Sequence, residues 1–241
     1  MKYIFDVDGT LTPSRQPIMP EFKDWFLDFC KHNEVYIVTG SDYPKTVEQL
    51  GEDIMFAVRK SYNCSGSDVY EKGKNIHKNH WCPQDELYEF LEGWLLKSPY
   101  PTKLGNHIED RPGMVNFSIV GRNADLEQRK KYYEYDVKFE ERRMIAEEIN
   151  LNFEDITCTV AGETGVDIHP VGCDKSQILR DFREDIDFVR FFGDRCEAGG
   201  NDYPLLKALG NDKSYWVKDW MMTKELLTFQ NFHIYSKYNT T

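Results

Sequence analysis

Residues 6–11 read Asp-Val-Asp-Gly-Thr-Leu and follow directly after the apolar run Tyr3-Ile4-Phe5. Such a run predicts a buried strand, and open parallel sheets bind their ligands at the exits of these strands. Asp6 and Asp8 are two residues apart, so their carboxylates point the same way. A pair placed like this can hold a divalent cation and present one carboxylate as a nucleophile. Two solvated acids in a turn are the alternative interpretation.

The composition narrows the possible classes of function. The chain has 241 residues, of which 40% are hydrophobic, enough for one domain with a large insertion or for two domains. Its net charge of -11 argues against nucleic-acid and membrane-surface binding, because both need a basic face. No apolar stretch approaches the roughly 20 residues of a membrane span. Six scattered cysteines without a Cys-x-x-Cys pair favour reduced thiols and a cytoplasmic location.

The two ends of the chain alternate strand and helix, which predicts a parallel sheet with helices on both faces. At the start, the hydrophobic pattern predicts strands at Lys2–Phe5, Val35–Val38 and Ile54–Val58, a helix at Glu21–His32, and a short helix opened by Pro44. After residue 174 it predicts helices at Lys175–Phe182, Asn201–Leu209 and Met221–Phe229, and strands at Phe188–Phe192 and Tyr215–Val217.

The middle of the chain shows strand pairs separated by helices, the pattern of an α+β module with an antiparallel sheet. It predicts helices at Pro83–Leu96 and Asp125–Asn150, a hairpin of His107–Asp110 with Met114–Val120, and short strands at Thr157–Val160 and Val166–His169. We therefore predict an α/β fold: a Rossmann-like parallel-sheet core at 1–76 and 174–241, with an inserted α+β cap domain at 77–173. A lid on such a core is a common means of excluding water.

The acidic residues at strand exits predict phosphoryl transfer. Asp6 is the expected nucleophile, and Asp8 is the general acid and base that protonates the leaving oxygen and then activates the incoming hydroxyl. A carboxylate attacks an anionic phosphate poorly unless Mg²⁺ offsets the charges. Asp194 follows another expected strand and is the predicted further metal ligand. Asn201 and Asp202 either position ligands and waters or cap a helix.

Phosphoryl oxygens also need hydrogen-bond donors and positive charges. Thr39 and the backbone amides of Gly40 and Ser41 form a candidate cradle, and Lys175 can add a point charge unless it is a solvated lysine. Arginine forks recognise phosphate bidentately. Each arginine alone is more typical of a surface salt bridge, but four stand in or beside the motifs: Arg15, Arg111, Arg122 and Arg129.

These motifs resemble the haloacid dehalogenase superfamily and, within it, the eukaryotic-type phosphomannomutases, over nearly the whole chain. The residues that carry the resemblance are 6–15, Gly40-Ser41-Asp42, Gly113-Met114-Val115-Asn116, Gly121-Arg122-Asn123, Asp174-Lys175, Phe191-Phe192-Gly193-Asp194 and Gly199-Gly200-Asn201-Asp202.

The resemblance implies roles for the motif residues. Asp6 would be phosphorylated, and Asp8 would act as acid and base. Asp6, the backbone carbonyl of Asp8 and Asp194 would hold Mg²⁺. The phosphosugar would be bound by Arg15, Arg111, Arg122, Arg129 and Asp167. The inserted domain would be the cap, which also mediates dimerisation in the family.

The chain departs from the family pattern at four places. Gly165 stands where the family has a serine that contacts the sugar, and Asp110 puts an acid beside the phosphate-binding Arg111. Residues 206–210 lack the family's accessory cation motif, and Thr39 replaces a usual glycine.

The expected activity is a phosphohexomutase that interconverts hexose 1-phosphate and 6-phosphate, with mannose preferred, in mannose metabolism and GDP-mannose biosynthesis. A hexose bisphosphate would activate it by priming Asp6, and a cytoplasmic homodimer would form through the cap. The alternative is a sugar phosphatase of the same superfamily. A mutase must hold a second phosphate opposite the reacting one. The cap arginines could do this, so they favour the mutase over the phosphatase.

Overall fold

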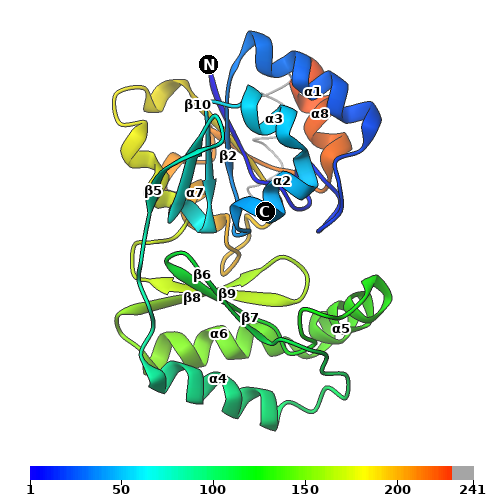
Figure 1. Ribbon diagram of the computed structural model, residues 1–241, viewed down its shortest axis with the longest axis vertical. Coiled ribbons are helices and arrows are strands. Elements are labelled where there is room, and N and C mark those ends of the chain that lie inside the picture. Colours follow the sequence, from blue (N-terminus) through cyan, green and yellow to red (C-terminus); the bar gives the residue numbers. More distant parts are fainter. Residues whose placement is uncertain (230–241) are drawn as a thin grey trace.

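The computed structural model describes residues 1–229 and contains two sheets, one above the other in Figure 1. We call the part around the seven-stranded sheet the core and the part around the four-stranded sheet the cap. This arrangement confirms the predicted fold class. The division at residues 77 and 173 stays a proposal, and strand β5 runs across the first of these positions.

The core sheet has the strand order β11-β10-β1-β2-β3-β4-β5. The first five strands in this order are parallel, and β4 and β5 extend one edge antiparallel. The strands are β1 (Lys2–Phe5), β2 (Glu34–Val38), β3 (Lys60–Asn63), β4 (Asp68–Glu71), β5 (Lys74–Lys78), β10 (Val189–Gly193) and β11 (Ser214–Trp216). Because β1 lies between β2 and β10, the loops that follow these three strands meet at one edge.

Helices cover both faces of the core sheet, because the side chains of each central strand alternate between two apolar clusters. Phe5 faces a cluster built by α1 (Pro20–His32), α2 (Tyr43–Leu50), α3 (Glu52–Ala57) and α8 (Trp220–Phe229), as Figure 1 shows. Ile4 faces the cluster on the other side, built by the 3₁₀ segment η2 (Lys175–Asp181) and by α7 (Tyr203–Leu209). Two short 3₁₀ turns complete the core, η1 (Cys64–Gly66) and η3 (Ile186–Phe188).

One expectation for the core was wrong. The segment Ile54–Val58, predicted as a strand, is mostly the end of helix α3, and the strand β3 follows at Lys60–Asn63. A short apolar run suits a buried strand and a buried helix equally well. The predicted helix Lys175–Phe182 is a 3₁₀ helix that ends at Asp181. The hairpin of β4 and β5 was not predicted, because the exposed strand β5 has no apolar pattern.

The cap is a four-stranded antiparallel sheet in the order β6-β7-β9-β8, with helices on the face turned away from the core (Figure 1). Its elements are β6 (Ile108–Arg111), β7 (Met114–Phe117), β8 (Ile156–Ala161), β9 (Gly165–Pro170), α4 (Asp85–Lys97), α5 (Leu126–Phe139) and α6 (Glu141–Asn152). The predicted single helix Asp125–Asn150 is thus two helices, because Glu140 is left-handed with φ of 54°.

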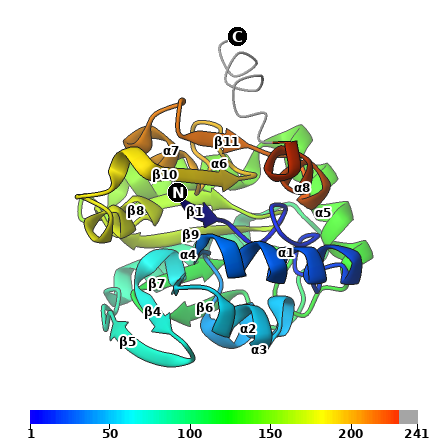
Figure 2. The ribbon, with the colours of Figure 1, turned by 90° about the horizontal axis from the view of Figure 1, so that it is seen from above.

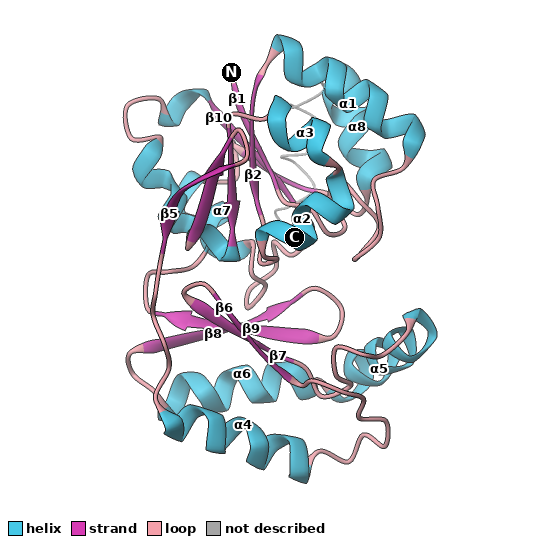
Figure 3. Ribbon diagram, viewed as in Figure 1, coloured by secondary structure: helices cyan, strands magenta, loops and turns pink. Residues whose placement is uncertain are grey.

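The open face of the cap sheet meets the loops that follow the core strands. Figure 3 shows these loops between the two sheets, and Figure 2 shows the core lying over the cap. Val160 N in β8 donates to Gly199 O in the core across 3.0 Å, so backbone groups of the two parts are in contact. Among residues 1–229, no helix is long and apolar enough to cross a membrane.

Candidate active site

Asp6 and Asp194 converge because they follow the adjacent parallel strands β1 and β10. Asp6 N donates to Phe192 O across 2.9 Å, which continues the strand pairing up to the acid. Gly9 turns the chain with φ of +78°, and a Cβ at this position would clash with the Asp194 carboxylate. The glycine of the motif therefore serves two purposes, since it permits a left-handed turn and leaves room for the second acid.

A buried lysine partly neutralises the acids. The Lys175 side chain is 1% exposed, and its Nζ donates to Asp6 Oδ1 and to Asp202 Oδ1, each across 2.6 Å. Asp202 Oδ2 accepts from the backbone N of Arg195 across 3.0 Å. Lys175 was predicted as a charge for the phosphoryl group, and the structure places it directly on the proposed nucleophile. The sequence alone allowed Asp202 to be either a residue that positions ligands or the N-cap of a helix. In the structure its carboxylate anchors this lysine.

The acids suit a hard divalent cation. Single carboxylate oxygens of Asp6, Asp194 and Asp202 lie within 4.8 Å of one another. Burial raises the pKa of Asp6 to about 7, although Lys175 opposes the shift, and burial with the neighbouring Asp6 raises the pKa of Asp194 well above its usual range. Because both oxygens of Asp202 already accept hydrogen bonds, the carboxylates of Asp6 and Asp194 have oxygens that are freer to ligate a metal ion. A cation here would offset the negative charge of these buried carboxylates.

Asp8 is held apart from this cluster. Its Oδ1 accepts from the backbone N of Arg15 and from Gln49 Nε2, the latter across 2.9 Å. Gln49 lies in α2, is 1% exposed, and was not identified as a site residue from the sequence. Its place on the helix face that packs against the core could have indicated a role for this polar side chain. The side chain of Asp8 was predicted to act as acid and base, and its backbone carbonyl to bind the metal. The two hydrogen bonds fix the carboxylate, which suits the role of acid and base.

The predicted phosphate cradle lies at the exit of β2. Thr39 Oγ1 accepts from the backbone N of Ser41 across 3.1 Å, and this bond shapes the turn. A Cβ on Gly40 would lie 2.6 Å from Asp167 Oδ2, so the glycine allows the cap residue to approach the core. All four residues line one pocket of about 70 Å³ together with Asp6 and with residues of the cap.

Two cap arginines share one carboxylate. Arg111 Nη2 donates to Glu109 Oε2 across 2.7 Å, and Arg122 pairs with the same oxygen. Arg111 Nη1 also donates to Gly40 O across 2.8 Å and so ties the cap to the cradle. Glu109 was not identified as a site residue from the sequence. It holds both guanidinium groups toward the pocket, where they leave a net positive charge.

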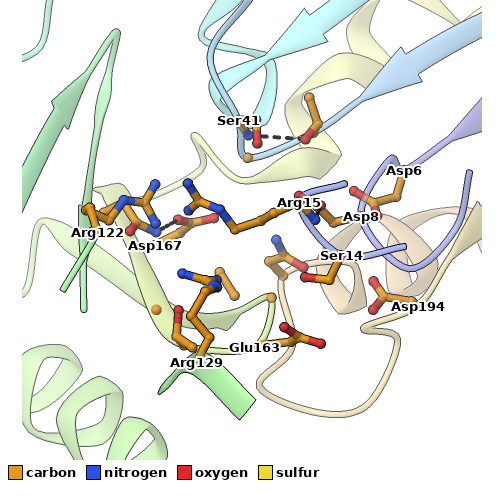
Figure 4. Close-up of a pocket in the computed structure, with 18 of the residues that line it drawn as sticks. Asp6, Asp8, Ser14, Arg15, Ser41, Arg122, Arg129, Glu163, Asp167 and Asp194 are labelled. Carbon is orange, nitrogen blue, oxygen red and sulfur yellow. Dashed lines mark hydrogen bonds between the residues drawn. The ribbon is translucent and has the colours of Figure 1, made fainter. Parts of the chain in front are cut away.

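Two nitrogens of the buried Arg129 guanidinium lack hydrogen-bond partners among the described residues. The two nitrogens are Nε and Nη1, and the residue is 6% exposed. Burial and the nearby Arg15 lower its pKa to about 10, and burial with Arg111 and Arg15 lowers that of Arg122 to about 10. Buried guanidinium nitrogens without acceptors cost free energy, so this end of the pocket favours an anion that would accept from them. Figure 4 shows Arg122 and Arg129 at the opposite end from Asp6 and Asp194.

A polar pair lies on the cap side near Gly40. Asn116 Nδ2 donates to Asp167 Oδ1 across 2.7 Å, while Asn116 Oδ1 and Asp167 Oδ2 are buried without a partner among the described residues. Both free atoms are acceptors, so they suit hydroxyl donors such as those of a sugar. A Cβ on Gly165 would lie 3.0 Å from Asn116 Nδ2. The absence of a side chain at Gly165 thus lets Asn116 approach closely.

The departure at Asp110 lies outside the pocket. Asp110 Oδ1 accepts from Tyr88 OH across 2.6 Å, and the residue is exposed. Neighbours in a strand point to opposite faces, so Asp110 points away where Arg111 points toward the pocket. The acid beside Arg111 in the sequence therefore does not oppose phosphate binding there.

Comparison with known proteins identifies the family. The family described as "Eukaryotic phosphomannomutase" matches residues 22–217. A phosphomannomutase from Saccharomyces cerevisiae is 32% identical over 211 residues, which cover 84% of this chain and 83% of that protein. A probable phosphomannomutase from Caenorhabditis elegans is 32% identical over 214 residues, which cover 84% of each chain. The chain belongs to the eukaryotic phosphomannomutase family.

Solved structures of the superfamily share the fold of this phosphomannomutase family member. A sugar phosphatase of haloacid dehalogenase subclass IIB superposes with a TM-score of 0.59 at 18% identity, over 95% of this chain and 99% of that chain. At this identity the likeness concerns the fold alone. The resemblance inferred from the motifs is therefore confirmed at the level of the family.

Proposed function

We propose that this chain is a phosphohexomutase that interconverts hexose 1-phosphate and hexose 6-phosphate, with mannose as the preferred sugar. The observation that supports it most is that two buried nitrogens of Arg129 have no acceptor among the described residues, at one end of a pocket whose other end holds Asp6. A mutase must hold one phosphate while it transfers another, so it needs both ends at once. The family of the chain agrees with this proposal.

The residues of the chain support a two-step mechanism. Asp8 takes the proton of the free sugar hydroxyl, whose oxygen attacks the phosphorus of phosphorylated Asp6, and the bond from phosphorus to Asp6 breaks to give a hexose bisphosphate. The bisphosphate then turns around in the pocket. Asp6 Oδ2 attacks the phosphorus of the other phosphate, the bond to its sugar oxygen breaks, and Asp8 protonates that oxygen. Gln49 keeps the Asp8 carboxylate in place. Mg²⁺ held by Asp6 and Asp194 would neutralise the phosphoryl oxygens.

The cap supports the distal phosphate in this mechanism. Arg122 and Arg129 offer charge-assisted donors that a small monoester would not reach. We therefore expect Arg129→Leu to slow isomerisation of mannose 1-phosphate by about ten- to a hundredfold, since such a contact contributes roughly 1.5–3 kcal/mol. Hydrolysis of p-nitrophenyl phosphate should change little. Phosphorus NMR follows both the isomer and inorganic phosphate in one time course.

Arg143→Leu is the matched control, because Arg143 is exposed on α6 and pairs with the surface residues Glu140 and Glu147. It should retain both activities. If Arg129→Leu lowers the two activities equally, and no hexose bisphosphate stimulates the wild type, then a sugar phosphatase becomes the better assignment.

Mg²⁺ binding is expected to release protons. Because the pKa of Asp6 is raised to about 7, the folded apo protein binds more protons than the unfolded chain between about pH 4 and 7. Its stability therefore falls as pH rises through this window, and the cation restores it. We expect apparent Mg²⁺ affinity to be about tenfold lower at pH 6 than at pH 8. The apparent affinity is measured from the rise of the melting temperature with Mg²⁺ concentration at the two pH values. Equal affinities would contradict the assigned ligands.

A further inference from the structure

Arg195 and Tyr133 join the core to the cap beside the catalytic acids. Arg195 directly follows Asp194 in the loop after β10, and Tyr133 lies in the cap helix α5. The guanidinium carbon lies 5.8 Å from the centre of the Tyr133 ring, within the range of a cation–π contact. Arg195 Nε lies 3.7 Å from Asp194 Oδ2. One side chain thus connects a proposed metal ligand to the cap.

A second cavity of about 370 Å³ opens at this junction. Asp8 and Asp194 line both this cavity and the substrate pocket, so the two spaces meet at the catalytic acids. Figure 4 shows Asp194 and Glu163, which both cavities also share, on the side away from Arg122. The remaining wall includes Tyr133 and Arg195. Solvent therefore has a route to the acids that does not pass the cap arginines.

Two further contacts between cap and core are hydrogen bonds to backbone oxygens. Arg111 donates to Gly40 O across 2.8 Å, and Val160 N donates to Gly199 O across 3.0 Å. These hydrogen bonds to the backbone hold the cap at the cradle and at β8. At the side cavity the buried Arg195 Nε has no hydrogen-bond acceptor among residues 1–229, and Arg195 contacts the Tyr133 ring and interacts with its hydroxyl, so closure there depends on side chains.

Water at this place would compete with the sugar. On phosphorylated Asp6, the oxygen of either water or a sugar hydroxyl attacks the phosphorus, and the bond from phosphorus to Asp6 breaks. Asp8 takes the proton of the attacking oxygen in both cases. Attack by water yields inorganic phosphate, whereas attack by the hydroxyl yields a phosphosugar. The two reactions use the same residues, so access of water decides between them.

We propose that Tyr133 and Arg195 form a gate that keeps bulk water from phosphorylated Asp6 and so sets the ratio of transfer to hydrolysis. Both are positioning residues, since they act through closure and through Asp194. The inference rests on the proposed function, because only a mutase needs a long-lived phosphoenzyme.

The lifetime of the phosphoenzyme tests the gate. The wild type, Tyr133→Ala and Tyr133→Phe are phosphorylated with p-nitrophenyl phosphate, the donor is removed, and loss of phosphate is followed by intact mass after acid quenching. Alanine is a good helix former, so α5 is retained. We expect decay in Tyr133→Ala to be at least about fivefold faster than in the wild type. Tyr133→Phe keeps the ring and loses only the hydroxyl, so its decay should stay much closer to the wild-type rate than that of Tyr133→Ala.

Glu134→Ala is the matched control, because Glu134 is the exposed neighbour on the same helix. It should not change the decay. An unchanged rate in Tyr133→Ala, or an equal increase in Tyr133→Phe or Glu134→Ala, would overturn the gate. The decay requires no isomerisation, so a wild type that fails to isomerise mannose 1-phosphate would refute the proposed function and leave the comparison valid.

Discussion

Asp6→Asn is expected to abolish turnover of mannose 1-phosphate, with a loss on the order of 10⁴-fold or more. An amide cannot take the phosphoryl group as an acyl phosphate, so both half-reactions are lost. The fold should persist, because asparagine retains an oxygen that can accept from Lys175 Nζ, now 2.6 Å from Asp6 Oδ1. A phosphorus NMR time course measures turnover. Intact mass after exposure to substrate should show phosphate on the wild type alone.

Asp28→Asn serves as the control, since Asp28 is an exposed residue of α1 whose carboxylate is 64% exposed. It should match the wild type in turnover, and both variants should unfold near the wild-type temperature. Substantial turnover by Asp6→Asn, with deamidation excluded by mass, would remove the aspartyl-phosphate mechanism.

Lys175→Met is expected to cost about 3–5 kcal/mol of unfolding free energy at pH 8, and most of the activity with it. The lysine is 1% exposed and bonded to Asp6 and Asp202, so its loss leaves uncompensated buried carboxylates beside Asp194. The two carboxylates hold the pKa of Lys175 above its usual value, so the wild-type pair is charged at pH 8. Urea unfolding measures the loss.

The pH dependence of that loss separates charge from packing. The pKa of Asp6 is about 7 even with the lysine in place, so at pH 5.5 this carboxyl is largely protonated and the penalty should shrink. Lys60→Met is the control, because Lys60 forms a partly exposed pair with Asp181 and should cost less than about 1 kcal/mol. Equal losses in the two variants at pH 8 would contradict the role given to Lys175.

The local sequence predicted which acids meet at the strand ends. Asp6, Asp8 and Asp194 were identified because apolar runs mark strands, and the exits of parallel strands meet at one edge. The alternation of strand and helix determined the fold class in the same way. It failed at Ile54–Val58, where a short apolar run suits two structures, and at β5, whose exposed residues have no pattern.

Only the tertiary structure decided which side chains meet. Gln49 reaches Asp8 from 41 residues away, Lys175 joins Asp6 to Asp202, and Glu109 gathers two arginines. The contact of Tyr133 with Arg195 likewise crosses from cap to core. Hydrophobic periodicity encodes which face of each element is buried. It does not encode the order of strands or the docking of one sheet on another, and these bring distant residues within hydrogen-bonding distance.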